Sequence, residues 1–263
     1  MNLIAKIWCY RDFILMSVKR EFQVRYRNTS LGALWVILNP LAMIAVYIII
    51  FSKMMRGQIS DGNNPYAYGI YLCSGILVWG YFSELMNRGL GIFLENANLI
   101  KKINFPKACL PIIVFFNGLT NFLVIFSLFT VFVLFTGNFL GWSYLLLIPI
   151  LGIFTILGMG IGLLIGFINV FFRDVGQLFG IFMQLWFWFT PIVYPYKILP
   201  KIIQDWEILN PATCLIEAVH SIVLTGQIGP LTPLCYPLIL GVCLSSVALF
   251  LFKNYFSDLV DEL

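Results

Sequence analysis

The sequence predicts an all-α membrane protein with six transmembrane helices, an N-terminal surface helix, and short re-entrant helices between the fifth and sixth spans. Hydrophobic residues make up 60% of the 263 residues and charged residues only 11%, which is far outside the range of soluble domains. No Asp, Glu, Lys, Arg or His occurs between Lys107 and Arg173, so the charges are confined to segments between apolar blocks. These observations indicate a chain that crosses a membrane several times.

Residues 1–30 are predicted to form an amphipathic helix that lies along the membrane surface. Apolar residues recur there at helical spacing, and basic residues occupy much of the remaining surface. The apolar set is Ile4, Ile7, Trp8, Ile14, Leu15, Val18 and Phe22, and the basic set includes Lys6, Lys19, Arg20, Arg25 and Arg27. Basic helices with aromatic residues on the apolar side bind at the lipid–water interface. Calmodulin targets share the pattern, but the apolar span that follows favours the membrane.

Residues 31–263 are predicted to form a single transmembrane domain of six helices. About 20 apolar residues are enough to cross a bilayer. In the second span, Glu84 is expected at the inner helix end, where a charge costs less, and it is placed to pair with Arg88, four residues on. In the fourth, Gly158, Gly162 and Gly166 predict a face for close helix packing, and packing is favoured there over dimerisation. The predicted spans are 31–52, 66–85, 108–136, 144–169, 175–194 and 231–252.

Residues 195–230 join the fifth and sixth spans. Charged residues such as Lys201 and Glu217 make this segment too polar for lipid, although 208–224 is an apolar stretch. Pro200, Asn210-Pro211 and Gly226 interrupt it. We therefore expect two short re-entrant or interfacial helices.

The distribution of Lys and Arg predicts the orientation of the chain. With the N-terminus in the cytoplasm, twelve of the 16 basic residues fall in cytoplasmic segments and four on the opposite side. Cytoplasmic loops of membrane proteins carry such an excess of positive charge. Six spans then place both termini in the cytoplasm.

The sequence excludes several kinds of chemistry. It has no Gly-x-x-x-x-Gly-Lys-Ser/Thr phosphate loop, so we do not expect this chain to bind ATP in the usual way. A single histidine, His220, and six scattered cysteines disfavour a metal site. Intramembrane charge, which marks proton and ion pumps, is nearly missing, so a secondary transporter is disfavoured. The formal net charge of +4 reflects cytoplasmic loops and does not indicate nucleic-acid binding.

Polar and aromatic residues at membrane depth predict a substrate path. Sugars suit such a path, because their apolar faces stack on aromatic rings while their hydroxyls bond to amides. Packing between helices is the alternative for each residue alone. Phe179, Phe182, Trp186 and Phe189 form the opposite face of the fifth span and are expected in lipid or in the core. The predicted path residues are Trp35, Asn39 and Met43 on the first span, Gln177, Gln184 and Trp188 on the fifth, and Tyr66 and Tyr194 nearer the outer mouth.

Residues 96–111 form a short basic island between two apolar blocks. Leu99, Ile100 and Ile103 have near-helical spacing, and Phe105-Pro106 would end the helix. The three lysines of the island place it on the cytoplasmic side. The residues alone leave two interpretations open: a topological anchor, or a docking surface for a cytoplasmic partner.

Several segments resemble the permeases of polysaccharide-exporting ABC transporters. These segments are Arg25-Tyr26-Arg27-Asn28-Thr29-Ser30-Leu31-Gly32-Ala33-Leu34-Trp35, Leu38-Asn39-Pro40, residues 98–106, Phe172-Arg173-Asp174-Val175, residues 190–195, and Leu209-Asn210-Pro211. Each motif alone is weak, but their order and spacing extend over nearly the whole chain.

The resemblance implies a homodimer in the inner (cytoplasmic) membrane, paired with two copies of a separate ATP-hydrolysing subunit that binds ATP and Mg. Such transporters move lipid-linked polymers, of which O-antigen is our first choice, capsule the second, and teichoic acid a third. The resemblance also implies a cytoplasmic gate at Arg25, Tyr26 and Arg27. It implies a coupling helix that docks on the ATPase, made of Asn98, Leu99, Ile100, Lys101, Lys102 and Ile103.

Two other functions are weighed against polymer export. An ABC permease for drugs or haem would share the fold and the coupling helix. A membrane-embedded lipid-linked sugar transferase belongs to a different class and would need acidic catalytic groups. Asp205, Glu207 and Glu217 are its candidates, and no motif supports them. We therefore expect a transport subunit and not an enzyme.

Overall fold

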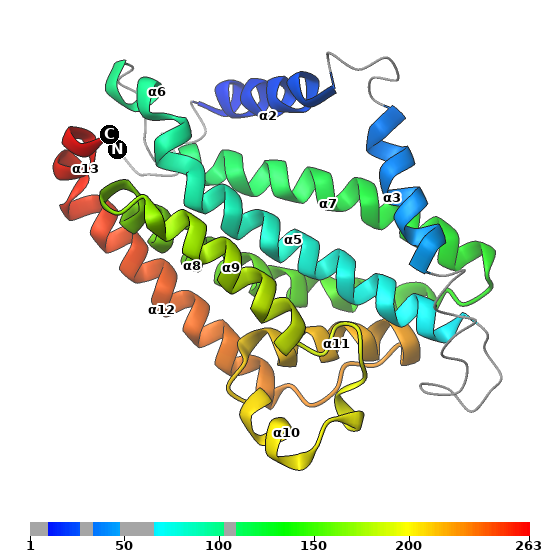
Figure 1. Ribbon diagram of the computed structural model, residues 1–263. Helices are drawn as coiled ribbons and strands as arrows, with labels where there is room; N and C mark the ends of the chain where they lie inside the picture. Colours follow the sequence, from blue (N-terminus) through cyan, green and yellow to red (C-terminus); the bar gives the residue numbers. More distant parts are fainter. Residues whose placement is uncertain (1–9, 27–33, 48–65, 103–108) are drawn as a thin grey trace.

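The computed structural model describes residues 10–26, 34–47, 66–102 and 109–263, and no strand occurs within these ranges. Long helices run roughly side by side, and shorter helices lie across both ends (Figure 1). In chain order the first helices are α2 (Arg11–Tyr26), α3 (Trp35–Val46), α5 (Ala67–Glu95), α6 (Ala97–Lys102), α7 (Cys109–Phe135) and η3 (Gly141–Leu146). They are followed by α8 (Leu147–Phe171), α9 (Asp174–Phe189), η4 (Tyr196–Ile198), α10 (Lys201–Glu207), α11 (Pro211–Thr225), α12 (Thr232–Asn254) and α13 (Phe256–Glu262).

Four helices of the described residues are long and apolar enough to cross a membrane: α5, α7, η3 with α8, and α12. The number rises to five if α10 and α11, bent by 101° at their junction, are counted as one span. The predicted first span, 31–52, contains the 12-residue helix α3, and its remaining residues lie mostly outside the described ranges. The predicted fifth span contains α9, which has 16 residues and is short for a bilayer that takes about 20.

The predicted boundaries of the third, fourth and sixth spans lie close to those of α7, η3 with α8, and α12, whereas the predicted second span is too short. The prediction ended the second span at residue 85, but α5 continues for ten further residues to Glu95. Glu84 therefore lies inside a continuous helix, where its charge needs partners on α5 itself and on neighbouring helices. The sequence-based expectation of a carboxylate at a helix end was wrong.

The long helix α5 lies at the centre of the bundle. It packs against α7, α8 and α11, and α8 in turn packs against α12. Phe82, Leu85 and Met86 of α5 are fully buried against a core that includes Phe154 and Leu157 of α8. A central helix buried on several sides positions the groups that it carries.

Glycines allow α5 and α8 to approach at backbone distance. A Cβ added to Gly162 would lie 2.9 Å from the Met86 Cα, and one added to Gly158 would lie 3.1 Å from the Phe82 ring. Gly166 faces the Gly89 carbonyl on the same side of α8. The prediction of a small-residue packing face is confirmed, and this face packs within the chain.

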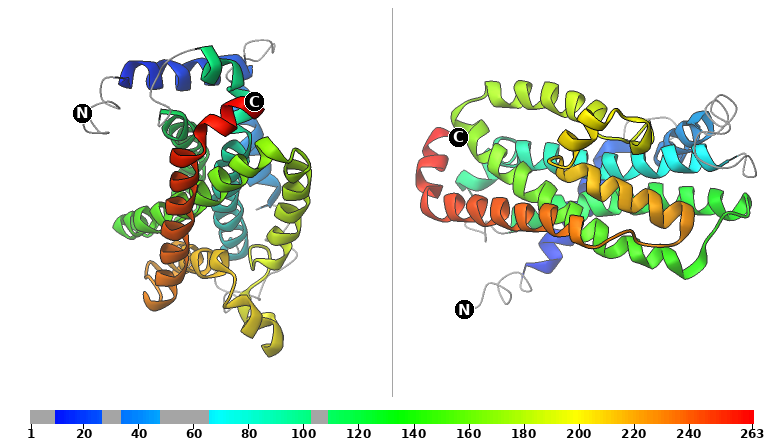
Figure 2. Two further views of the ribbon diagram at one scale, coloured as in Figure 1. Left: turned by 90° about the vertical axis from the view of Figure 1, so that its left-hand side faces the viewer. Right: turned by 90° about the horizontal axis from the view of Figure 1, so that it is seen from below.

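The two ends of the bundle differ. The helices α2, α6 and α13 lie at one end and α10 at the other (Figure 1), and α2 crosses the long helices at a steep angle (Figure 2). Ile14 of α2, Ile100 of α6 and Leu259 of α13 share a buried apolar cluster with the ends of α5, α7 and α8. On α2, Ile14 is buried, but Leu15 and Met16 are exposed (64% and 72%), so Leu15 lies outside the buried stripe.

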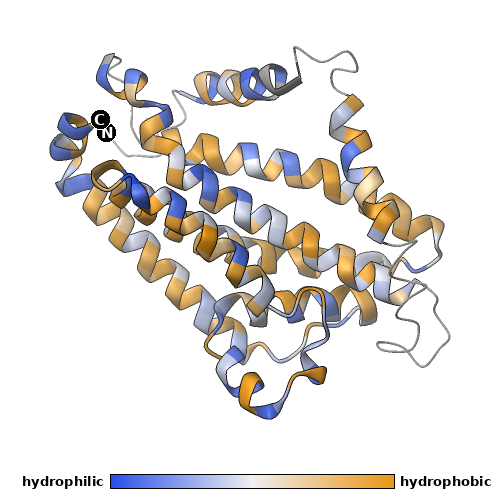
Figure 3. Ribbon diagram, viewed as in Figure 1, coloured by the Kyte–Doolittle hydropathy of each residue, from blue (hydrophilic) through white to orange (hydrophobic). Residues whose placement is uncertain are grey.

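Figure 3 shows that α7 and α12 are apolar along most of their length, as expected of lipid-facing helices.

Candidate functional site

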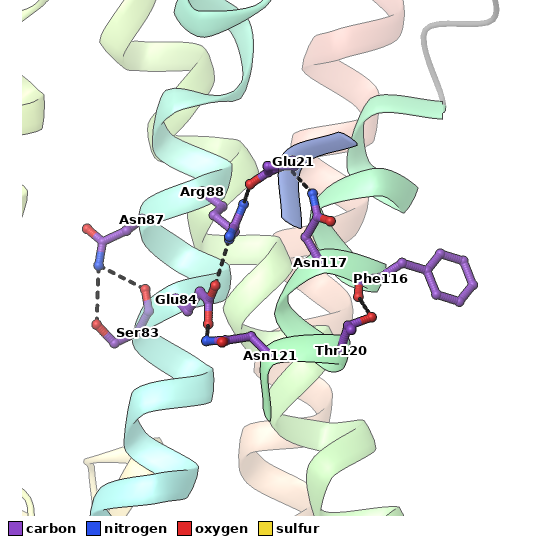
Figure 4. Close-up of polar contacts among 9 residues, drawn as sticks. All are labelled: Glu21, Ser83, Glu84, Asn87, Arg88, Phe116, Asn117, Thr120 and Asn121. Carbon is purple, nitrogen blue, oxygen red and sulfur yellow. Dashed lines mark hydrogen bonds and ion pairs between the residues drawn. The ribbon is translucent and has the colours of Figure 1, made fainter. Parts of the chain in front are cut away.

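A cluster of polar side chains joins α2, α5 and α7 near the end of the bundle that carries α6 (Figure 4). Arg88 donates from Nε to Glu84 Oε1 at 2.9 Å and pairs through Nη1 with Glu21 of α2. Asn121 of α7 donates to Glu84 Oε2 at 2.6 Å, and Asn117 donates to Glu21. The cluster contains two carboxylates and one guanidinium, and each carboxylate oxygen has a partner.

The local sequence explains how these side chains meet. Residues four apart on a helix lie one above the other, so Glu84 and Arg88 share a face of α5. The same spacing puts Asn117 and Asn121 on the face of α7 that meets α5. The side chains of Arg88 and Glu84 are 20% and 16% exposed. Charged groups at this depth are costly unless they are paired and hydrogen-bonded, and here they are.

A cavity of about 250 Å³ lies next to this cluster, between α3, α5 and α7. Glu84 and Asn121 belong both to the cluster and to the wall of the cavity. The α3 side contributes Asn39, Met43 and the ring of Tyr47. Two predicted path residues, Asn39 and Met43, are thus brought together with Glu84 and Asn121, which the prediction did not assign to the path.

The other predicted path residues lie elsewhere. Trp35 and Tyr66 are exposed, at 44% and 41%, and Tyr66 meets Phe132 edge-on. Tyr194 donates its hydroxyl to the Trp188 carbonyl at 2.7 Å. Gln177, Gln184 and Trp188 are exposed on α9.

The two opposite faces of α9 are both exposed in a single chain. Phe179 and Met183 bury α9 against the core, whereas Phe182 and Phe189 are 50% and 65% exposed. Phe182 and Phe189 line an apolar hollow of about 700 Å³ together with Trp206 of α10. The expected single face of Phe179, Phe182 and Phe189 is therefore split between core and surface, and the choice between the two exposed faces stays a prediction.

The predicted coupling segment forms α6, which is a short helix as expected. Asn98 and Lys101 are exposed, and Leu99 is half-buried. Ile100 is only 8% exposed, in the cluster that it shares with Leu259. The side chain of Ile100 is thus covered by its own chain, and docking of α6 on an ATPase stays a prediction. The Lys102 side chain and Ile103 lie outside the described residues.

The predicted cytoplasmic gate lies at the end of α2. Arg25 and Tyr26 are its last residues, but their side chains, like all of Arg27, fall outside the described part. The gate stays a prediction. The structure adds Glu21, one helical turn earlier, which bonds to Arg88 of α5 and to Asn117 of α7.

A second polar joint lies toward the end that carries α10. Asn210 accepts from the Trp186 indole N–H at 2.8 Å and from the Ala212 backbone N–H at 3.1 Å, and it donates to the Thr190 hydroxyl at 3.1 Å. Tyr68 of α5 donates to the carbonyl of residue 193 at 2.7 Å. Asn210 therefore joins the segment 209–211 to Trp186 and Thr190, and Tyr68 joins residue 193 to α5.

Sequence reasoning missed Asn117, Asn121 and Glu21. The two asparagines are uncharged polar residues four apart in an otherwise apolar span, and this spacing was the available signal. For Glu21 no local signal existed, because its partners lie 67 and 96 residues away.

Long apolar helices around a buried central helix, with polar joints at both ends, define a multi-pass membrane protein. Among the residues that the structure describes, no group of three or more His, Cys, Asp or Glu is placed to hold a metal ion. The chain belongs to the ABC-2 type transporter family, whose sequence profile matches residues 13–224.

Named relatives cover most of the chain. It is 29% identical over 240 residues to the O-antigen export system permease protein RfbA of Myxococcus xanthus, covering 89% of this chain and 88% of the relative. It is 28% identical over 220 residues to RfbA of Klebsiella pneumoniae, covering 83% and 82%. It is 24% identical over 248 residues to the polysialic acid transport protein KpsM of Escherichia coli, covering 91% and 88%. The resemblance found in the sequence is confirmed at the level of the family.

Proposed function

We propose that this chain is the transmembrane permease subunit of an ATP-driven exporter that moves lipid-linked polysaccharide across the inner membrane. The observation that carries the proposal is the match to O-antigen export permeases, which covers 83% to 89% of the chain. The polysialic acid relative covers a similar share at lower identity, so capsule-like polymers are the second choice and teichoic acid the third.

The proposal includes six spans with both ends in the cytoplasm. Four spans are α5, α7, η3 with α8, and α12. The first is α3 with its flanking residues, and the fifth is α9 with residues 190–194. The helices α10 and α11 enter from the outer side without crossing. This layout is supported by the bend of 101° between α10 and α11 and by the position of α2, α6 and α13 at one end.

Labelling of introduced cysteines tests the topology in a variant without native cysteines. A cysteine at exposed Lys101 should react only with reagents that reach the cytoplasm, and one at exposed Trp206 should react from outside. Labelling of position 101 from outside would rule out the proposed orientation.

The proposed complex pairs a homodimer of this chain with two ATP-binding subunits. Exposed Asn98 and Lys101 on α6 support a docking role for this segment. The absence of a phosphate loop from the sequence supports a division of labour in which the partner hydrolyses ATP.

Reconstitution tests the function directly. The chain and its ATP-binding partner are placed in proteoliposomes with a lipid-linked glycan, and transfer of the glycan across the bilayer is measured. We expect transfer that requires ATP and both subunits. Transfer of haem or a drug, with no transfer of any lipid-linked glycan, would overturn the proposal.

Glu207, one of the acidic candidates for a sugar transferase, has a structural role in this chain. Glu207 is 5% exposed and accepts hydrogen bonds from the Thr213 hydroxyl and, at 3.4 Å, from the Asn210 amide. Its carboxylate therefore holds the joint between α10 and α11, and a structural role accounts for it.

A further inference from the structure

The cavity between α3, α5 and α7 has the size of a single ring. Its volume is about 250 Å³. Pockets that take drug-sized ligands measure roughly 300 to 1,000 Å³, so this cavity admits one compact group and not a polymer segment. The ligand for which it is suited is therefore a single group the size of one ring.

Three side chains that line the cavity can form hydrogen bonds with a ligand: Glu84, Asn121 and Asn39. The Glu84 carboxylate accepts one bond on each oxygen, from Arg88 at 2.9 Å and from Asn121 at 2.6 Å. A carboxylate has about four acceptor positions, so two remain for hydroxyl donors. The Asn121 amide, held in place by its bond to Glu84, keeps an oxygen that accepts a further bond. Asn39 adds a second amide from α3.

The remaining wall offers aromatic and apolar surface. Tyr81 and Phe122 lie with their ring centroids 4.9 Å apart, and Tyr47 lines the α3 side. The Tyr81 hydroxyl is bound to Thr155 of α8 at 2.7 Å, so Tyr81 offers its ring to the cavity. A ligand that fits has one apolar face for these rings and several hydroxyls for the amides and the carboxylate.

From this arrangement we infer that the cavity binds one uncharged sugar ring of the transported glycan. The inference rests on the proposed function and adds the place and the charge class of the sugar. Pyranose sugars combine an apolar ring face with hydroxyl donors, and the cavity wall offers both aromatic rings and hydrogen-bonding side chains.

The charge of the cavity favours neutral over acidic sugars. Of the described residues that line it, only Glu84 carries a formal charge. Its positive partner Arg88 is already shared between Glu84 and Glu21. A sugar carboxylate or a phosphate in the cavity would face Glu84 at close range in a medium of low dielectric constant, where like charges repel strongly.

Gly80 offers a way to fill the cavity without disturbing the packing. It lines the cavity, and a Cβ added there would meet no described atom within 4 Å. Gly152 of α8 is an equally open glycine that does not line the cavity, so Gly152→Leu is the matched control for Gly80→Leu.

Sugar binding is measured on the complex with its ATP-binding partner in lipid nanodiscs, because detergents with sugar headgroups would compete. The probes are a neutral mannose trisaccharide and a sialic acid trisaccharide, followed by ligand-observed NMR. We expect the neutral probe to bind wild type and the Gly152→Leu variant alike, and Gly80→Leu to raise its Kd about tenfold or more. The sialic acid probe should bind wild type about tenfold more weakly than the neutral probe.

A charge variant tests the expected preference for neutral over acidic sugars. Glu84→Gln keeps the side-chain size and removes the charge, so it should narrow the difference between the two probes; its unfolding temperature is measured in parallel. Gly80→Leu retains both Glu84 and Arg88, so it tests the site without removing either charge.

Several outcomes would overturn the inference. These are absence of neutral-probe binding to wild type, equal binding by Gly80→Leu, equal or tighter binding of the sialic acid probe, or a tightly held acyl chain in the cavity. Glycan transfer by the wild-type complex in proteoliposomes separates this inference from the proposed function. If transfer occurs and Gly80→Leu does not affect binding, the site is wrong and the function stands. If no lipid-linked glycan is transferred, the function itself fails.

Discussion

Arg88 and Glu84, one turn apart on α5, form an ion pair with 2.9 Å between Nε and Oε1. Both side chains are largely buried, and Arg88 reaches on to Glu21 of α2. The pair thus ties the surface helix to the central helix. Loss of Arg88 would leave the carboxylates of Glu84 and Glu21 without the cation that they share.

Replacing Arg88 alone should destabilise the protein more than replacing the pair. Loss of one partner of a fully buried ion pair costs about 3 to 5 kcal/mol, because the other charge stays uncompensated. Because these side chains are 20% and 16% exposed, the loss of Arg88 should cost less than that. We expect Arg88→Met to lower the unfolding temperature strongly and the double variant Glu84→Gln, Arg88→Met to recover part of the loss. Thermal unfolding of the purified protein measures both.

The exposed pair of Arg11 and Asp12 is the control for this experiment. Its atoms are 3.7 Å apart and its side chains are 58% and 80% exposed. Surface ion pairs contribute about 0 to 1 kcal/mol, so Asp12→Asn should change the unfolding temperature little. An Arg88→Met variant as stable as Asp12→Asn would contradict the structural role of the cluster.

Gly162→Ala should destabilise the contact between α5 and α8. The new methyl group would lie 2.9 Å from backbone atoms of Met86, which cannot turn away as a side chain can. Overpacking of this kind costs about 1 to 3 kcal/mol. At Gly152, where an added Cβ meets nothing within 4 Å, alanine should be neutral or should stabilise the helix by up to about 1 kcal/mol. Equal unfolding temperatures for the two variants would show that the helices can move apart freely.

Local spacing predicted the contacts that lie within one helix or on one helix face. The Glu84–Arg88 pair follows from two residues four apart, and the glycine face of α8 follows from a repeat of four. The boundaries of α7, α8 and α12 follow from hydrophobicity, because lipid requires apolar surface along a whole span.

Contacts between distant segments could not be predicted in the same way. Nothing near Glu21 in the sequence points to Arg88 or Asn117, since the approach depends on how α2 lies across the bundle. The spacing of Leu99 and Ile100 predicted an apolar face on α6, but periodicity does not say what covers that face. In the structure, the cluster that contains Leu259 of α13 covers Ile100.

Asn210→Ala should loosen the joint between α9 and α11. Asn210 caps α11 through the Ala212 N–H, and substitution of such a cap by alanine costs about 0.5 to 2 kcal/mol. The Trp186 indole N–H would also lose its acceptor, which adds the cost of an unpaired donor. Thermal unfolding should show a clear drop in the unfolding temperature.

Tyr236→Phe is the control, because it removes one exposed hydrogen bond, to the Leu209 carbonyl, and leaves the cap in place. Equal losses in the two variants would argue against Asn210 as the centre of the joint.

Variants of α6 should separate folding from coupling to the ATPase. Ile100→Asp places a charge in the buried cluster, so it should lower the unfolding temperature of the chain alone. Lys101→Glu changes an exposed residue and should leave that temperature unchanged. It should weaken binding of the ATP-binding subunit in a manner that depends on salt, because exposed charges at an interface mainly tune association. Co-purification at two salt concentrations measures binding. If Lys101→Glu binds the partner normally at low and high salt, α6 acts as an anchor only.

The last prediction concerns the two exposed faces of α9. A sliding polymer must not be gripped at one position, and stacking on an aromatic ring tolerates shifts along the chain. By analogy with base stacking, one such contact is worth about 1 to 3 kcal/mol. Trp188 is 59% exposed, on the face that also carries Gln184, so Trp188→Ala should slow glycan transfer while the unfolding temperature stays close to wild type. Phe182, 50% exposed on the other face, is the matched control, and Phe182→Ala should leave transfer nearly unchanged. Slow transfer by Phe182→Ala with normal transfer by Trp188→Ala would instead assign the path to the hollow between α9 and α10, where Phe182 and Phe189 lie with Trp206.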